Sequence, residues 1–290
     1  MNLLKYFSKF RRELYKTLSK LCLKQASINY CGLQMKVPIL HGLGAGLLVQ
    51  DDKWMSDCLS VFLKEKEGVV VDVGVNIGLY LVKLKALDAT RDYIGFEPNA
   101  VCNYYTEELI RANDFKSVRI FPFALSDKKE LRTFYIRRKA DKMGSLNHYA
   151  RFGEIDKYAF DLFTFKGDEF FEIIEPVALC VFKIDVEGAE LEVLRGLIST
   201  IKKYTPFVYC EIWQLPEKDH PTYHEKLERL ILIRKLIEGI DYKVLGVSEK
   251  DAFNIKVLNT LEDFDGSHRR DYILVHKSEA ASLLNKLTQI

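Results

Sequence analysis

The chain carries the stretch Val69-Val70-Val71-Asp72-Val73-Gly74-Val75-Asn76-Ile77-Gly78, and this stretch indicates the fold. Its first five residues form a short and mostly β-branched run, as in a strand buried within a parallel sheet. Residues 77–87 fit the start of a helix. Glycines at a turn from strand to helix let the backbone pass close to a ligand, and the helix N-terminus behind them offers free N–H groups. The stretch therefore predicts a strand–turn–helix unit that binds a small cofactor.

Two cofactors suit such a turn, a nicotinamide dinucleotide and S-adenosylmethionine. A dinucleotide turn usually reads G-x-G-x-x-G because the pyrophosphate needs the second glycine, whereas Asn76 holds that position here. S-adenosylmethionine has no phosphate, so close approaches at Gly74 and Gly78 suffice. Glu97 follows Asp72 by 25 residues, at the end of the next expected strand, where a carboxylate accepts both ribose hydroxyls. Both cofactors contain a ribose, so Glu97 indicates a nucleoside without choosing between them.

Strand and helix patterns alternate from residue 69 onward. Strands are expected at 69–73, 92–96, 118–123, 179–185, 206–212, 242–247 and 271–276. Helices are expected at 77–87, 99–113, 187–203 and 222–239, with a short helix at the end of the chain. The alternation predicts an α/β fold, a doubly wound and mostly parallel seven-stranded sheet with helices on both faces. Residues 137–170 are the least regular part, where we expect an insertion that carries substrate loops.

The N-terminal part is expected to be an extension at 1–53, followed by the cofactor-binding domain at 54–290. Residues 1–22 place apolar side chains at helical spacing and hold six basic residues against one acidic residue. Such a basic amphipathic helix could lie on an anionic membrane surface, pack on its own domain, or pack on a second subunit of a homo-oligomer. Residues 26–40 fit two short strands around a turn, and the glycine-rich loop 41–46 is either a connector or a cover for the substrate.

Composition narrows the class of protein. Hydrophobic residues make up 48% and charged residues 29% of the chain, as in a globular protein, and a net charge of +2 is too mild to predict nucleic-acid binding. The six cysteines are scattered, and Cys180 and Cys210 lie in apolar runs, so we expect buried thiols in a reducing cytoplasm rather than disulfides or a metal cluster. No run approaches the ~18 apolar residues of a membrane span, and the charged N-terminus is unlike a signal peptide.

A second group of informative residues follows another apolar strand. Asp185 ends that strand and Glu211 ends the next one along the chain. Open α/β sheets place ligands at the carboxyl ends of their strands, and neighbouring strands lie about 4.8 Å apart, so the two carboxylates could converge. Burying a carboxylate there is costly unless it has a partner or a function, and we assign both a functional role. Lys183 is expected to pair with a carboxylate, and Glu187 and Glu190 to cap the following helix.

Together these motifs resemble the FkbM-type methyltransferases of the class I, S-adenosylmethionine-dependent fold. The resemblance is carried by the glycine turn 72–78, Gly95-Phe96-Glu97-Pro98-Asn99, Ala124-Leu125-Ser126-Asp127, Gly144-Ser145-Leu146, the block 183–190 with Leu194-Arg195-Gly196, and the Glu211 strand. It covers about residues 30–277, and the block 183–196 is its most specific element. This chain departs from the family at Val75, where a smaller residue is usual, and at residues 164–168, where a Leu-Asp pair is usual. We therefore carry no role onto Asp168.

The resemblance implies a methyltransferase domain that binds S-adenosylmethionine through the glycine turn and the ribose acid. The expected cofactor-binding residues are Asp72, Gly74, Asn76, Gly78, Glu97, Pro98, Ser126 and Asp127. Members of the family are associated with O-methylation of sugars or other hydroxylated natural products. A small-molecule or glycan acceptor is therefore expected.

Methylating a neutral hydroxyl needs a base to take its proton. Asp185 is the first candidate and Glu211 the second, or the pair could hold a divalent cation such as Mg²⁺ that orients a diol. Alternative bases, each more often a surface residue, are His41, His148, His220 and His224. Two other functions stay open, a nicotinamide-dependent oxidoreductase and a catalytically silent module of the same fold that binds other proteins.

Overall fold

The computed structural model describes residue 17 and residues 24–40, 43–48, 53–136, 144–147, 158–213, 215–248, 254–258 and 271–290. Several predictions concern residues outside these ranges, namely the amphipathic segment 1–22 apart from residue 17, His41, His148, and most of 137–157. Within the described ranges, no helix has both the length and the apolar character that crossing a bilayer requires.

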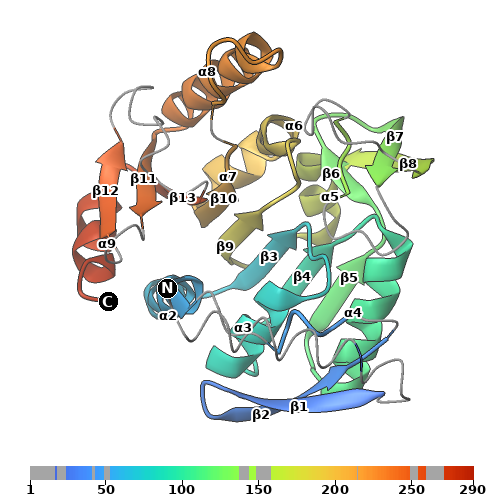
Figure 1. Ribbon diagram of the computed structural model, residues 1–290. Coiled ribbons are helices and arrows are strands. Elements are labelled where there is room, and N and C mark those ends of the chain that lie inside the picture. Colours follow the sequence, from blue (N-terminus) through green and yellow to red (C-terminus); the bar gives the residue numbers. More distant parts are fainter. Residues whose placement is uncertain are drawn as a thin grey trace.

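An eight-stranded sheet forms the centre of the molecule (Figure 1). Its strands are β3 (Val69–Val73), β4 (Tyr93–Phe96), β5 (Val118–Phe121), β9 (Leu179–Ile184), β10 (Phe207–Glu211), β11 (Tyr242–Ser248), β12 (Asn254–Leu258) and β13 (Asp271–His276). In space they follow the order β12-β11-β13-β10-β9-β3-β4-β5. The strands from β10 to β5 in this order run parallel, and β13 is antiparallel to both of its neighbours. All seven predicted strands are present, and β12, which the pattern did not reveal, pairs with β11 at the edge.

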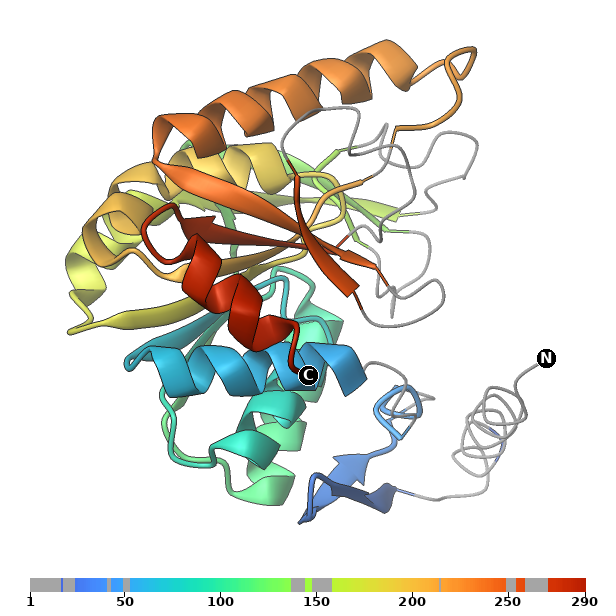
Figure 2. The same ribbon diagram turned by 90° about the vertical axis from the view of Figure 1, so that its left-hand side faces the viewer.

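Helices cover both faces of this sheet (Figure 2). One face is covered by α2 (Lys53–Glu65), α3 (Leu79–Leu87) and α9 (Ala280–Leu287). The other is covered by α5 (Gly167–Ile174), α6 (Glu190–Gly196), α7 (Ile198–Tyr204) and α8 (Tyr223–Gly239). Successive side chains of a strand point to opposite faces, so Val70 packs in one core cluster and Val71 in the other. The predicted doubly wound, mostly parallel α/β fold is confirmed.

A two-stranded hairpin of β1 (Gln25–Tyr30) and β2 (Leu33–Pro38) packs on α3 and on α4 (Ala100–Asn113). Cys31 and Gly32 form its turn with φ angles of 48° and 86°, and a two-residue hairpin turn of type I′ requires positive φ at both positions. Buried side chains of the hairpin share one hydrophobic cluster with side chains of α3 and α4. The two strands expected around this turn are therefore confirmed.

Tyr105 of α4 ties the hairpin to the helix layer. Its buried hydroxyl donates a hydrogen bond of 2.9 Å to the carbonyl oxygen of Pro38. Gly44 has a φ of 87°, and a Cβ at its position would lie 2.1 Å from the same carbonyl oxygen. Only glycine therefore fits at this position. The described part of residues 1–53 thus shares a core with the sheet domain.

Part of the expected insertion 137–170 has regular structure. The strand β8 (Tyr158–Lys166) lies between β6 (Ala124–Ser126) and β7 (Glu130–Ile136) in a three-stranded sheet, and α5 begins directly after it. The sequence of β8 has aromatic residues on both faces, and Phe160 and Phe163 are exposed. An alternating apolar and polar pattern is therefore missing, which explains why the strand was not predicted.

The helix expected at 187–203 is two helices, α6 and α7. It begins later than expected because Glu187 and Gly188 have left-handed φ angles of 55° and 104°. At Gly196, where α6 ends, a Cβ would lie 1.9 Å from the carbonyl oxygen of Ser126 in β6. The close contact between the helix and β6 therefore requires a glycine.

Replacing Tyr105 by Phe tests the attachment of the hairpin. The carbonyl of Pro38 would lose its donor in a buried place, so we expect the free energy of unfolding to fall by about 1–2 kcal/mol in urea denaturation. Tyr104→Phe is the matched control, because the neighbouring tyrosine is 61% exposed, and it should change stability by less than ~0.5 kcal/mol. Equal stabilities of the two variants would contradict the structural role of Tyr105.

Candidate functional site

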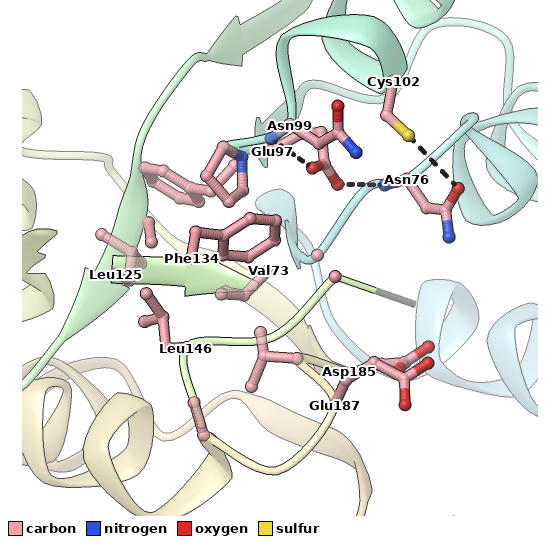
Figure 3. Close-up of a pocket in the computed structure, with 17 residues that line it drawn as sticks. Val73, Asn76, Glu97, Asn99, Cys102, Leu125, Phe134, Leu146, Asp185 and Glu187 are labelled. Atoms are coloured by element: carbon pink, nitrogen blue, oxygen red, sulfur yellow. Dashed lines mark hydrogen bonds between the residues drawn. The ribbon is translucent and has the colours of Figure 1, made fainter. Parts of the chain in front are cut away.

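A cavity opens at the carboxyl ends of β3, β4 and β9 (Figure 3). It contains about 660 Å³ of empty space, part of it open to solvent, which suits a small-molecule ligand. Its apolar lining includes Val73, Phe96, Leu125, Phe134 and Leu146, and its polar lining includes Asn76, Glu97, Asn99, Asp185 and Glu187. Figure 3 shows Glu97 and Asn76 on one side of the cavity and Asp185 and Glu187 on the other.

Glu97 is held by two backbone amides at the end of β4. The N–H of Asn76 donates to its Oε2 at 2.7 Å, and the N–H of Asn99 donates to its Oε1 at 2.8 Å. Burial raises the pKa of Glu97 to about 7, although both N–H groups act in the opposite direction. Each carboxylate oxygen can accept a further hydrogen bond, so Glu97 can still accept from a ligand diol in the cavity.

The glycine turn brings two strand ends into contact. Gly74 has a φ of 88°, and a Cβ there would lie 2.0 Å from the carbonyl oxygen of Asp185. Gly78 begins α3 with a φ of 81°, and Asn76 between them also has a positive φ, 55°. Gly74 lines the cavity, but its lack of a side chain is required first by the close approach of Asp185.

A buried lysine connects this turn to the candidate base. The Nζ atom of Lys183 lies 3.1 Å from Oδ1 of Asp72 and 3.4 Å from Oδ2 of Asp185, and it donates to the carbonyl of Gly74 at 2.7 Å. Tyr93 donates to the other Asp72 oxygen at 2.6 Å. Burial alone would lower the pKa of Lys183, but the two carboxylates raise it above its usual value. Lys183 is therefore an ion-pair partner, as predicted.

Asp185 and Glu211 are brought together, as the sequence predicted. Burial, the negative charge of Asp185 and a hydrogen bond with that residue raise the pKa of Glu211 to about 9. Asp271 stands directly opposite Glu211 in the pairing of β10 with β13 and accepts a hydrogen bond from Tyr209. The raised pKa favours the protonated form of Glu211 at neutral pH, in which it is hydrogen-bonded with Asp185. Asp271 could not be predicted from the sequence, because it meets Glu211 only through the antiparallel pairing of β13 with β10 in the folded sheet.

The loop 185–190 is held in place by residues to which no role had been assigned. The hydroxyl of Ser145 donates to the carbonyl of Glu187 at 2.6 Å, and the side-chain amide of Asn147 donates to the carbonyl of Gly188 at 2.6 Å. Arg132 in turn donates to the side-chain oxygen of Asn147 at 3.2 Å. Gly144-Ser145-Leu146 had been noted only as a motif, and nothing in the sequence showed which loop it would hold.

The other predicted cofactor residues take different places. Pro98 lines the cavity together with Gly74, Asn76 and Glu97. Four predicted cofactor residues do not line the cavity, namely Asp72, Gly78, Ser126 and Asp127. Of the two catalytic candidates, Asp185 lines the cavity and Glu211 does not. Asp72 lies beneath the turn and is fully buried, and Ser126 is buried against Gly196.

The alternative bases and the metal site find little support. His220 is half-buried and His224 exposed, and neither lines the cavity. Across the described ranges, no three His, Cys, Asp or Glu side chains are grouped so that they could hold a metal ion. The cysteines at 58, 102, 180 and 210 are buried, as predicted for Cys180 and Cys210.

Comparison with known proteins identifies a family. Residues 72–244 match the family described as the methyltransferase FkbM domain. A solved methyltransferase FkbM from Methylobacillus flagellatus KT shares 15% identity, with 72% of this chain and 43% of that chain covered and a TM-score of 0.44. A putative caffeoyl-CoA O-methyltransferase from Staphylococcus aureus shares 11% identity, with 94% and 98% covered and a TM-score of 0.45. Such likenesses identify neither residues nor a substrate, and this chain spans less than half of the first protein. No curated protein matches the chain.

Replacing Lys183 by Met tests the buried ion pair. Asp72 would lose the cation that offsets the burial of its carboxyl group, so we expect the free energy of unfolding to fall by about 3–5 kcal/mol. Lys116→Met is the control, because its partner Asp114 and Lys116 itself are both at least 75% exposed, and it should cost less than ~1 kcal/mol. Adding Asp72→Asn to Lys183→Met should recover part of the loss. A double variant that is less stable than Lys183→Met would contradict this interpretation.

The raised pKa of Glu211 predicts a pH dependence of stability. The folded state keeps the proton up to about pH 9, whereas the unfolded state releases it near the ordinary value of 4.5. The stabilisation is therefore complete below the unfolded pKa and is lost as the pH rises through the folded pKa, by up to about 1.4 kcal/mol per pH unit. Glu211→Gln cannot titrate, so between about pH 7.5 and 8.5 its stability should fall less steeply than that of the parent. Parallel curves in urea denaturation would contradict the assignment of the proton to Glu211.

Proposed function

The chain belongs to the FkbM methyltransferase family, and from this premise we propose that it transfers the methyl group of S-adenosylmethionine to a hydroxyl oxygen of a sugar or another hydroxylated natural product. Membership of this family decides between the two cofactors that the sequence left open, and against the nicotinamide-dependent oxidoreductase. The observation that carries the O-methyl proposal is the position of Asp185. Its carboxylate lines the same cavity as Glu97 and is 34% exposed, so a substrate can reach it.

The residues of the cavity fit S-adenosylmethionine. Glu97 stands at the end of β4 with acceptor capacity for the two ribose hydroxyls. Phe96, Leu125 and Phe134 offer an apolar surface for a flat aromatic base. The bound cofactor supplies an electrophilic methyl group on a positively charged sulfur. Asp185 on the opposite side places a carboxylate in the same cavity, which suits a ligand with that charge.

In the proposed reaction Asp185 is the base. Its carboxylate accepts the proton of the acceptor hydroxyl while the oxygen of that hydroxyl takes the methyl group. Lys183 holds the carboxylate from below the glycine turn at 3.4 Å, and Ser145 and Asn147 fix the loop that begins with Asp185. Much of the rate enhancement would then come from alignment of the two reactants rather than from the base alone.

Glu211 would act through Asp185 rather than on the substrate. It is outside the lining of the cavity, it keeps its proton at neutral pH, and its hydrogen bond is to Asp185. Two neighbouring carboxyl groups in different surroundings can divide the roles of base and proton donor. We therefore propose Asp185 as the catalytic residue and Glu211 as its positioning residue.

Glu97→Ala tests cofactor binding. Loss of a charged acceptor for the ribose hydroxyls should weaken binding of S-adenosylmethionine or its demethylated product by ~1.5–3 kcal/mol, as measured by calorimetry. Glu108→Ala is the control, because Glu108 lies on α4 outside the cavity lining, and it should bind normally. Tight binding of a nicotinamide dinucleotide without binding of S-adenosylmethionine would refute the proposed cofactor.

Asp185→Asn tests the chemistry. The amide keeps the size of the side chain but cannot take a proton, so methyl transfer to a panel of hydroxylated acceptors should fall by ~10²–10⁴ while cofactor affinity changes little. Asp161→Asn is the matched control, since Asp161 is exposed on β8, outside the cavity lining, and accepts a hydrogen bond from Thr133. Comparable turnover of Asp185→Asn and the parent enzyme at saturating cofactor would move the base to another residue.

A further inference from the structure

A second cavity, more open than the first, lies between α6, the end of β10 and α8, and it contains about 400 Å³ of empty space, part of it open to solvent. It shares a wall with the first cavity, namely the loop 185–190. Asp185 and Glu187 of this loop line the first cavity, whereas Gly188 and Glu190 line the second. The chain passes from Glu211 directly into the lining of the second cavity at residues 212 and 213. The loop would therefore lie between a ligand in the second cavity and the candidate base, Asp185.

A buried carboxyl group faces this second cavity. Glu190 is only 4% exposed, and its Oε1 accepts the N–H of Gly188 at 2.9 Å. Burial raises its pKa to about 7. The sequence predicted only a capping role for Glu190, and the bonds from the backbone N–H groups of Gly188 and of Glu190 itself leave acceptor capacity on the two carboxyl oxygens. The cavity thus has what a small-molecule site needs, an apolar lining with a few polar groups that fix orientation.

The lining decides which chemistry suits the cavity. Ile212, Leu230 and Ile233 provide an apolar surface, and the half-buried Trp213 adds an aromatic ring. The Nζ atom of Lys226 lies 4.6 Å from the centroid of that ring. A ring-shaped ligand with one apolar face could pack against this surface and present polar groups to Glu190 and Lys226.

Charge argues for a neutral ligand. Arg229 lines the cavity, but both of its terminal nitrogens bond the carboxylate of Glu192, at 2.7 and 2.5 Å. Lys226 adds one positive charge, and Glu190 offsets it in part because its pKa lies near neutrality. A cationic ligand would meet Lys226 and an anionic ligand would meet Glu190, so neither charge is favoured.

We propose that the methyl acceptor reaches around loop 185–190, with its reacting hydroxyl at Asp185 in the first cavity and the part beyond that hydroxyl in the second cavity, and that this part is a neutral ring with an apolar face and hydroxyl groups that donate to Glu190. The inference rests on the proposed O-methyl transfer. Arg229 also donates to the carbonyl of Gly188 at 2.9 Å, so a ligand beside it would contact the residue that holds the shared wall. Glu190 is on this account a specificity-determining residue of the acceptor site.

The two tryptophans of the chain give a direct readout. Trp213 lines the second cavity, whereas Trp54 is buried in α2 against Tyr209. We would label the indole nitrogens with ¹⁵N, assign the Trp213 signal with Trp213→Phe, and titrate the full chain with neutral methyl pyranosides that differ in hydroxyl configuration. Concentrations up to about 20 mM are needed, because a single ring of this size binds in the millimolar range. At least one pyranoside should shift the Trp213 signal and leave the Trp54 signal unchanged.

Matched ligands test the class of chemistry. Tetrahydropyran has the ring without hydroxyl groups, and a methyl glucuronide and a methyl glucosaminide carry one negative and one positive charge. Each should bind more weakly than the best neutral pyranoside. Equal or stronger binding of any of these three, or no shift of Trp213 with any neutral pyranoside, would overturn the inference.

Matched variants test the residues. Glu190→Gln should weaken binding about three- to thirty-fold, because an amide has one acceptor oxygen and Gly188 already needs it. Lys226→Met at the rim should also weaken binding, and Lys235→Met on the exposed side of α8 should not. Unchanged affinity in both Glu190→Gln and Lys226→Met would overturn the inference.

Calorimetry with the demethylated cofactor separates the two proposals. Cofactor binding without any response of Trp213 would overturn the second site and leave the proposed function standing. A Trp213 response without cofactor binding would overturn the proposed methyl transfer, on which this assignment of the cavity rests.

Discussion

The ion pair of Lys183 with Asp72 is the interaction on which the rest of the site depends. The two residues are direct partners in the pairing of β9 with β3, and both are buried. Either charge, buried there without the other, would strongly destabilise the folded state. The same ammonium group also bonds the carbonyl of Gly74 and lies near Asp185. One buried charge thereby sets the relative position of the glycine turn and the candidate base.

Near the ammonium group of Lys183, the carboxyl groups of Asp185 and Glu211 have different surroundings. Glu211 shares a proton with Asp185 because two carboxylates at the end of neighbouring strands cannot both keep their charge cheaply. Asp185 has the ammonium of Lys183 at 3.4 Å and lines the cavity, whereas Glu211 lies outside the cavity lining. Residues of similar chemistry thus acquire different functions from their surroundings, as is common where an acid and a base act at one pH.

The loop 185–190 forms the wall between the two cavities. Donors fix it at two successive carbonyls, and Glu187 and Gly188 take left-handed conformations that a helix could not supply. Some of its residues line the first cavity and others the second, so one short piece of backbone can contact a cofactor on one side and a second ligand on the other. Rigid support of this kind is what an arrangement of reacting groups needs to hold its geometry.

The seven core strands, most of the helices between them, the glycine turn and the places of Glu97, Asp185 and Glu211 at strand ends could be predicted from the sequence alone. These are local properties, because periodicity, positive-φ glycines and residues at strand ends are set by neighbours along the chain. The tertiary structure decided the rest: the proton shared by Asp185 and Glu211, the position of Asp271 opposite Glu211, and the second cavity. Each of these depends on burial and on partners far apart in sequence, and only the packing of the sheet and helices brings those partners together.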